Sequence, residues 1–196
     1  MTAVLRTKRG PKLLDAGDVL STHPDSEYWG CALVLTARGA TDGFDPMCHI
    51  GITPAVFHRE FAFSELDLDR LSILEFDREI RLTDGTYTHL RRETCIGIYS
   101  RRYNAHVRVI GRADVASLPL PTLTFDVGDG ANGGWPLCGR VQAHLGGEAV
   151  AAWRAVHDRE RWLQERDAAR SRTEETFARI REDERRKRLA RKARRS

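Results

Sequence analysis

The chain has 196 residues, of which 31% are charged and 41% are hydrophobic, and its formal net charge is +4. This length suits one domain with a substantial core plus an appendage, and it is short for two full domains. No run approaches the roughly 18 apolar residues of a membrane span, and the N-terminal segment lacks the apolar core of a secretory signal. We therefore expect a cytoplasmic protein without a membrane partner.

The charge is unevenly distributed along the chain. Residues 151–196 hold sixteen Lys or Arg against nine Asp or Glu, whereas residues 1–150 hold sixteen against nineteen. The sequence therefore predicts an acidic body and a basic C-terminal appendage. Residues 1–14 form a separate basic N-terminal arm, carrying Arg6, Lys8, Arg9 and Lys12. A solvated arm is favoured there over one that touches nucleic-acid phosphates.

Residues 17–35 predict a β-hairpin, and the rest of the body is organised around it. Two apolar runs, 18–23 and 28–35, flank a turn made of Pro24, Asp25 and Ser26. Both faces of the second run are apolar, which predicts a strand packed on two sides. Gly30, in the middle of that run, predicts a bulge or a barrel corner.

Further strands follow at short intervals. Residues 47–52 predict a strand that Thr53-Pro54 ends, because proline lacks the ladder donor. Residues 64–71 fit either a helix or a strand, and a strand over 73–82 alternates with period two. Asp84-Gly85 predicts a tight turn. The remaining predicted strands are 86–91, 95–100 and 105–111. Together with the C-terminal pattern, they predict an α+β fold in which a small, mostly antiparallel SH3-like barrel over 15–147 precedes a long α-helix.

The last third of the chain changes character. A loop region over 117–147 is rich in Gly and Pro, and Trp135 is its expected anchor. No Gly or Pro follows Gly147, and apolar spacing predicts a helix over 148–168 packed on the body. The tail 169–196 predicts an exposed helix with ion pairs four residues apart, namely Glu175 with Arg179, Glu182 with Arg186, Asp183 with Lys187 and Glu184 with Arg188.

Two landmarks in the body resemble a known family. The order Gly17-Asp18-Val19, a Pro-Asp turn, then an aromatic residue, Gly30 and an apolar strand is similar to the opening of the Immunity protein 26 family. The run 105–111, which ends in Ile110-Gly111 ahead of Pro119 and Pro121, resembles its second landmark. The resemblance spans roughly residues 12–145 and leaves out the basic tail. It implies a non-catalytic protein that binds and neutralises a cognate bacterial toxin.

No motif with the spacing of an enzyme active site stands out, so no catalytic residue, cofactor or metal is predicted. A zinc site would need closely spaced ligands such as CxxC or HxxxH. The six candidates lack that spacing: Cys31, Cys48, His49, Cys95, His106 and Cys138. The cysteines lie among apolar neighbours and predict buried free thiols rather than a disulfide framework. The string 126–134 carries oxygen ligands among glycines, but a structural turn explains it better than calcium binding.

Two charged surfaces are candidate binding sites. Carboxylates gather in the middle of the body and could steer a basic toxin; they are Glu65, Asp67, Asp69, Glu75, Asp77 and Glu79. An ordinary solvated surface is the alternative. The tail ends in eight cations without an anion, namely Arg185, Arg186, Lys187, Arg188, Arg191, Lys192, Arg194 and Arg195. Without interleaved aromatic residues, they predict salt-sensitive, sequence-independent binding to nucleic-acid phosphates, or else a solubilising tail. The alternative function is therefore that of a nucleic-acid-associated protein.

Overall fold

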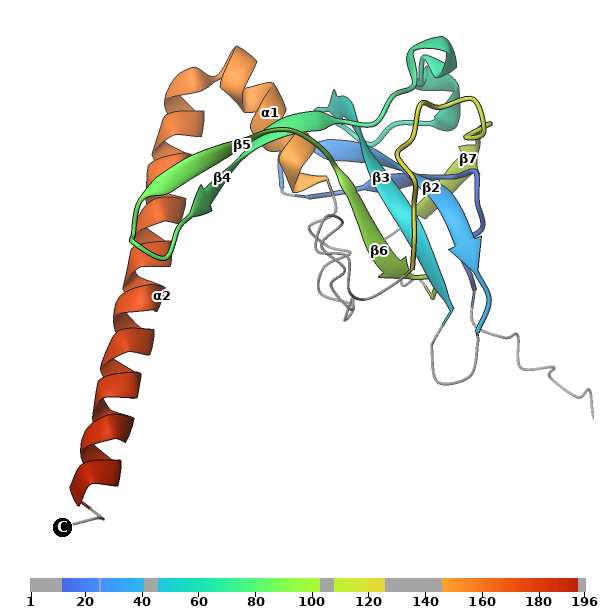
Figure 1. The fold of residues 1–196 in the computed structure, drawn as a ribbon. Helices are drawn as coiled ribbons and strands as arrows, with labels where there is room; N and C mark the ends of the chain where they lie inside the picture. The colour runs from blue at the N-terminus through green and yellow to red at the C-terminus, as the bar shows by residue number, and fades with distance from the viewer. Residues whose placement is uncertain (1–11, 25, 41–45, 103–107, 126–145, 194–196) are drawn as a thin grey trace, which may run out of the picture. The chain divides into compact units, whose positions relative to one another are not determined.

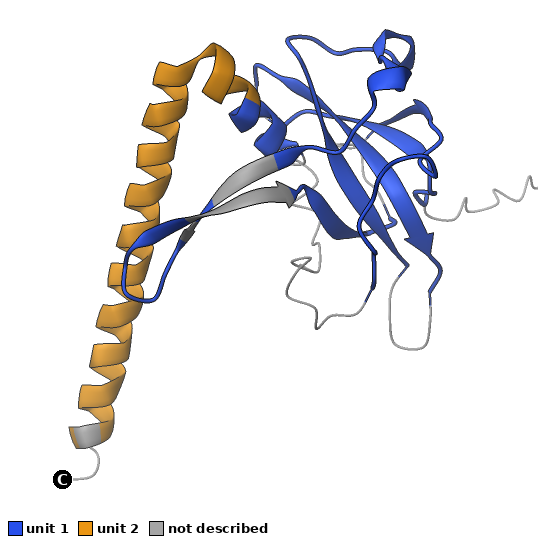
Figure 2. Cartoon of the chain, turned by 45° about the horizontal axis from the view of Figure 1, so that its top comes forward, with its two compact units in different colours: residues 1–152 blue, residues 153–196 orange. Residues whose placement is uncertain are grey.

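The structure is a computed structural model in which the chain divides into two compact units, residues 1–152 and residues 153–196 (Figures 1 and 2). The described strands all belong to the first unit. The residues that the structure describes are 12–24, 26–40, 46–102, 108–125 and 146–193.

A five-stranded antiparallel sheet forms the body of the first unit. Its strands stand in the order β6-β3-β2-β1-β7 (Figure 1). Their bounds are β1 Asp18–Thr22, β2 Trp29–Arg38, β3 Met47–Phe57, β6 Ile96–Ser100 and β7 Arg108–Arg112. All four neighbouring pairs are antiparallel. The predicted α+β class with mostly antiparallel strands is therefore confirmed.

The remaining two strands form a sheet of their own. β4, Glu75–Arg81, pairs with β5, Tyr87–Thr94, and the predicted turn at Asp84-Gly85 joins them. Gly85 has a φ of 90°, and the Asp84 carboxylate accepts the Thr86 N–H at 2.9 Å. β4 and β5 pair with each other, and the five-stranded sheet is open, with β6 and β7 as its edges. The predicted SH3-like barrel is not confirmed.

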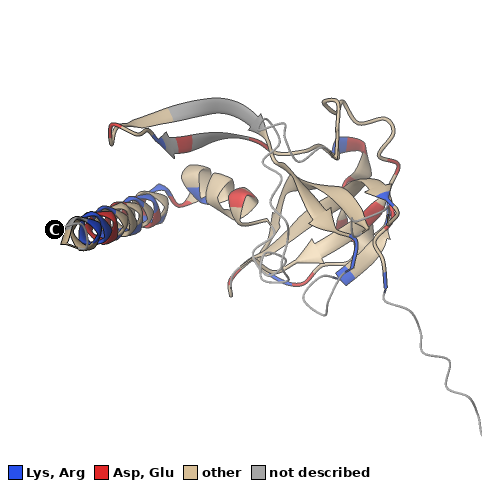
Figure 3. Cartoon of the chain, turned by 60° about the horizontal axis from the view of Figure 1, so that its bottom comes forward, with Lys and Arg blue, Asp and Glu red and all other residues tan. Residues whose placement is uncertain are grey.

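Two helices follow the sheet in the chain, α1, Gly147–His157, and α2, Arg159–Ala193. The sequence predicted one helix over 148–168, and the structure interrupts it at Asp158. The Asp158 carboxylate accepts the Arg161 N–H at 3.3 Å, as an N-cap residue does at the start of a new helix. The predicted long C-terminal helix is confirmed as α2, which carries both basic and acidic side chains (Figure 3). Among the described helices, none is long and apolar enough to cross a membrane.

The hairpin of β1 and β2 is confirmed, and so is the irregularity at its glycine. Val19 pairs with Leu33, and Ser21 pairs with Cys31. The β2–β3 register shifts next to Gly30, between Gly30 and Ala32, which places a bulge there. Asp25, one of the predicted turn residues, lies outside the described residues.

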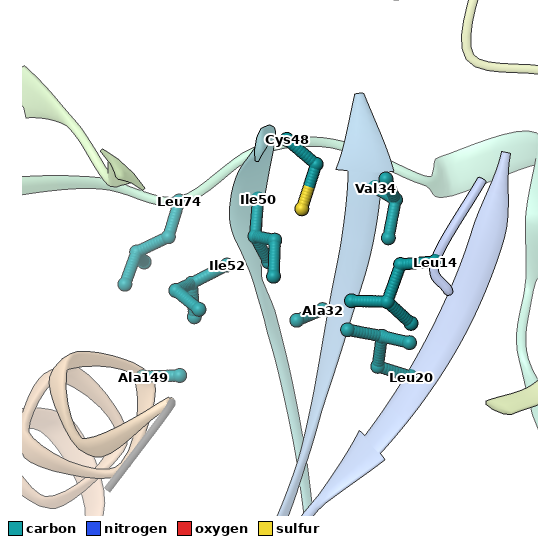
Figure 4. Close-up of a cluster of buried hydrophobic side chains, with 9 residues drawn as sticks. All are labelled: Leu14, Leu20, Ala32, Val34, Cys48, Ile50, Ile52, Leu74 and Ala149. Carbon is teal, nitrogen blue, oxygen red and sulfur yellow. The ribbon is translucent and has the colours of Figure 1, made fainter. Parts of the chain in front are cut away.

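Alternation along β2 divides the core into two clusters, one on each face of the sheet. The first cluster is built on Ala32 and Val34 (Figure 4) and consists of Leu14, Leu20, Ala32, Val34, Cys48, Ile50, Ile52, Leu74 and Ala149. Ala149 comes from the first turns of α1. The sequence places Leu14 in the N-terminal arm, but Leu14 is fully buried, because its N–H bonds to the Arg101 carbonyl and brings its side chain onto the sheet.

The second cluster lies on the opposite face and contains Val19, Cys31, Leu33, Leu35 and Phe61. Two irregular segments cover it, residues 61–73 and residues 113–123. The first segment holds two short 3-10 helices, η1, Phe63–Glu65, and η2, Leu68–Arg70. The sequence predicted either a regular helix or a strand over 64–71, and neither forms. Leu66 and Leu71 both pack on this cluster. One α-helix would turn these two side chains about 140° apart and could not bury both.

Strand β3 extends further than the sequence predicted. It continues through Thr53-Pro54 to Phe57, where the expectation was that Pro54 would end it. The register accounts for this, because Ala32 pairs with Ile52 and Gly30 with Val56, so Pro54 lies in a bulge without ladder bonds. Thr53 bridges the bulge: its hydroxyl donates to the Cys31 carbonyl at 2.9 Å and accepts the Ala55 N–H at 3.3 Å.

A close approach between Gly111 of β7 and Phe63 of η1 holds the 61–73 segment on the sheet. A Cβ atom on Gly111 would overlap the Phe63 ring. We expect Gly111→Ala to lower the free energy of unfolding by about 1–3 kcal/mol, the usual cost of overpacking. Urea denaturation followed by fluorescence would measure it. Gly39→Ala is the matched control, since a Cβ there meets nothing within 4 Å. Equal effects of both substitutions would contradict the role of this contact.

Candidate functional site

An open groove of about 300 Å³ lies between the bulge of β3 and the 61–73 segment. Its walls are mainly apolar, and Phe57 is stacked on Phe61 with ring centroids 4.0 Å apart. The residues that line this β3 groove are Thr53, Pro54, Ala55, Phe57, Glu65, Leu66, Asp67, Arg70, Leu71 and Ser72. Two short turns and a bulge thus leave space that a regular helix on a regular strand would fill.

The rim of the groove carries paired charges. Both carboxylate oxygens of Glu65 bind the guanidinium of Arg59, at 3.0 and 2.7 Å, and one of them also accepts the Ala62 N–H at 3.0 Å. The Arg59 hydrogen bond, followed by the Ala62 bond, holds the pKa of Glu65 below its usual value, so Glu65 stays ionised. Asp67 pairs with Arg70 at 3.5 Å. A partner therefore meets oriented carboxylates that already have one cation each.

The structure divides the six predicted acidic residues among three elements. Glu65 and Asp67 line the β3 groove, and Asp69 lies in η2 but does not line it. The other three belong to β4 in the separate two-stranded sheet. The β4–β5 register shifts between Phe76 and Arg78, where β5 holds one residue more than β4. The side chain of Asp77 lies outside the described part of the structure.

Sequence reasoning missed the apolar residues of the groove, Phe57, Leu66 and Leu71. The available signal was Pro54 inside an apolar run. Proline in a strand marks either a strand end or a bulge, and only the second reading leads to a groove at this place.

The side chain of His49, on β3, has no exposed surface. Its Nε2 donates to the Thr124 carbonyl at 2.9 Å, so its Nδ1 accepts from the Thr36 hydroxyl at 2.6 Å. Phe125 lies against the ring, with centroids 4.3 Å apart. Burial, and secondarily the charge of Arg38, lowers the pKa of His49, although the bond to Thr124 opposes this. His49 is therefore neutral, with both ring nitrogens occupied.

The two buried thiols, Cys31 and Cys48, are likewise held in the neutral form. Burial raises the pKa of Cys31 to about 11 and that of Cys48 to about 12. The three described cysteines are free. Among the described residues, no three His, Cys, Asp or Glu side chains gather closely enough to hold a metal ion. Of the other predicted positions, His106, Cys138, the string 126–134 and Trp135 lie outside the described residues.

The second candidate surface is the end of α2. Residues 181–191 are all exposed, and the predicted pair of Glu182 and Arg186 forms, with Oε1 and Nε 3.1 Å apart. Five of the eight predicted cations lie in this stretch: Arg185, Arg186, Lys187, Arg188 and Arg191. The side chain of Lys192, and Arg194 and Arg195, lie outside the described residues.

The His49 network should make stability depend on pH. The unfolded chain takes up a proton near the ordinary histidine pKa of 6.5, whereas the folded chain takes it up only at a lower pH. The free energy of unfolding should therefore fall as the pH drops below 6.5, by at most about 1.4 kcal/mol per pH unit. Urea denaturation between pH 7.5 and about 5.5, above the carboxylate range, would measure it.

His49→Gln is the matched variant, because its amide can donate to the Thr124 carbonyl but does not titrate. It should be less stable than the original chain near neutral pH and show a weaker pH dependence. A pH dependence of unchanged slope in His49→Gln would show that other groups cause it.

The chain matches no family model, no curated protein and no solved structure in comparisons with known proteins. Its function therefore has to be inferred from its own surfaces, the β3 groove and the basic end of α2.

Proposed function

We propose that the chain is a non-catalytic immunity protein that binds a cognate bacterial toxin in the cytoplasm and neutralises it. The observation that carries the proposal is the β3 groove, an open apolar groove of about 300 Å³ with carboxylates on its rim. The resemblance of Gly17-Asp18-Val19 and of Ile110-Gly111 to the Immunity protein 26 family supports the same function.

The groove has the composition of a protein-binding surface. Interfaces derive most of their affinity from a few apolar or aromatic side chains that enter a pocket and exclude water around them. Phe57, Leu66 and Leu71 offer such a pocket. Glu65 and Asp67, oriented by Arg59 and Arg70, would select a basic residue next to the apolar anchor. A toxin that acts on nucleic acid presents such basic residues around its cleft.

The chemistry of the described core is consistent with binding rather than catalysis. The groups with the greatest catalytic potential near the sheet are His49 and the thiols of Cys31 and Cys48. All three are buried. Burial raises the pKa of each thiol and lowers that of His49, and both changes favour the neutral form. Each stabilises the sheet in that state.

Co-expression with the product of the neighbouring gene tests the proposal. The chain should protect cells from that product and co-purify with it as a complex. If it does neither, the immunity function is wrong.

A cation placed at the mouth of the β3 groove should block the toxin. Ser72 is exposed and lines the groove, so Ser72→Arg adds a long, charged side chain there without disturbing the core. We expect it to weaken toxin binding by about tenfold or more, because the anchor can no longer enter. Isothermal titration calorimetry would measure the affinity.

Leu68→Arg is the matched control, since Leu68 lies in the same segment, is 45% exposed and does not line the groove. It should bind the toxin almost as well as the original chain. If both variants lose the same affinity for the toxin, the added charge is responsible and not the groove. If neither variant loses affinity, the toxin binds another surface.

A further inference from the structure

The charge of α2 is segregated along its length. Residues 159–184 hold seven Arg against eight Asp or Glu, whereas residues 185–192 hold six Lys or Arg and no acidic residue. We call residues 185–192 the cationic tip. At about 1.5 Å per residue, the nearly neutral part is a rod about 39 Å long that ends in this tip.

The cations of the tip surround the helix. Arg185, Arg186, Lys187 and Arg188 are consecutive, and successive residues of an α-helix point about 100° apart, so these four cover its whole circumference. All four are exposed. Leu189 is the one large apolar side chain in the tip, and it is 59% exposed. The tip therefore has no apolar side.

The distribution of cations around the helix favours a nucleic-acid duplex over a membrane surface as the ligand of the tip. A helix that binds a membrane surface needs one apolar face to enter the lipid and one cationic face toward the headgroups. A helix in the major groove of a duplex instead has phosphates on both of its flanks, and that groove is wide enough to admit it. Cations on all sides of the helix fit the duplex.

We propose that the cationic tip binds the phosphate backbone of duplex nucleic acid without reading its sequence. This activity goes beyond toxin neutralisation and does not depend on it. The tip contains no aromatic residue to stack on bases. Binding is therefore driven by the release of counterions from the phosphates.

Three acidic residues directly before the tip limit its affinity. Glu182, Asp183 and Glu184 stand four residues ahead of Arg186, Lys187 and Arg188. The first of these pairs is formed, with Glu182 Oε1 and Arg186 Nε 3.1 Å apart. Phosphates must compete with these carboxylates for the same cations. The acidic triplet thus acts as an intramolecular competitor of the nucleic acid.

The salt dependence of binding to a short duplex DNA, followed by fluorescence anisotropy on the full chain, tests the proposal. With roughly five phosphates neutralised, log affinity should fall with log salt with a slope of about −4.5. The triple variant Arg185→Gln, Arg188→Gln, Arg191→Gln should flatten the slope by about 2.7, because each lost contact removes about 0.9.

A second triple variant, Arg166→Gln, Arg170→Gln, Arg172→Gln, removes the same charge from the nearly neutral part of α2. The last substituted residue, Arg172, lies about 20 Å along the helix from Arg185. This distance is more than two Debye lengths at physiological salt. Its slope should stay that of the original chain. Equal flattening by both triples would show that net charge alone is sensed and would overturn the site.

A third variant, Glu182→Gln, Asp183→Asn, Glu184→Gln, should bind DNA about tenfold more tightly, because three cations lose their competitors. Circular dichroism would show whether helix content changes. Unchanged or weaker DNA binding would overturn the role of the triplet. Binding to anionic phospholipid vesicles without binding to DNA, or binding to neither, would overturn the proposed ligand.

Discussion

Strand β2 has apolar side chains on both faces, and this constraint determines much of the first unit. Cys31, Leu33 and Leu35 point to one face, and Ala32 and Val34 point to the other, all buried. At roughly 25 cal/mol per Å² of apolar surface, leaving either face in water would cost several kcal/mol. Both faces therefore need a cover, although α1 is the only α-helix that the described residues of the first unit contribute.

The two faces are covered in different ways. On one face, Leu14, Leu74 and the first turns of α1 supply compact apolar side chains. On the other, the 61–73 and 113–123 segments lie across the sheet without regular helices or strands. Irregular segments must satisfy their own backbone groups, and η1 does so with the Glu65 carboxylate on the Ala62 N–H. The β3 groove results from this irregular cover, since two short turns cannot fill the space above a bulge.

The sequence predicted what depends on local pattern. The hairpin follows from two apolar runs around a Pro-containing turn, and the long helix follows from a segment without Gly or Pro. Pairing between distant strands is not encoded in period-two alternation, so the pairing of β1 with β7 and of β3 with β6, and the open edges at β6 and β7, could not be predicted from it. Leu14 shows the same limit, because its burial depends on a hydrogen bond to Arg101, which is 87 residues away in the sequence.

The two candidate sites also differ in how far local sequence determines them. The cations of α2 are contiguous in sequence, and one helix arranges them, so the predicted basic surface could be placed residue by residue as far as Arg191. The acidic residues could not be placed, because three elements carry them and Arg59 and Arg70 pair with two of them. His49 became interpretable only through Thr124, which is 75 residues away.

The cationic tip is in conflict with the rest of its helix. An exposed helix with few apolar contacts gains stability from opposite charges four residues apart, and Glu182 with Arg186 provides such a pair. Within the tip, Lys187 and Arg191 stand four apart with like charge, and Arg188 and Arg191 stand three apart, so each pair destabilises the helix. Such local conflict is characteristic of functional positions, where another requirement outweighs stability. Bound phosphates would remove this repulsion, because each cation would then have an opposite charge beside it.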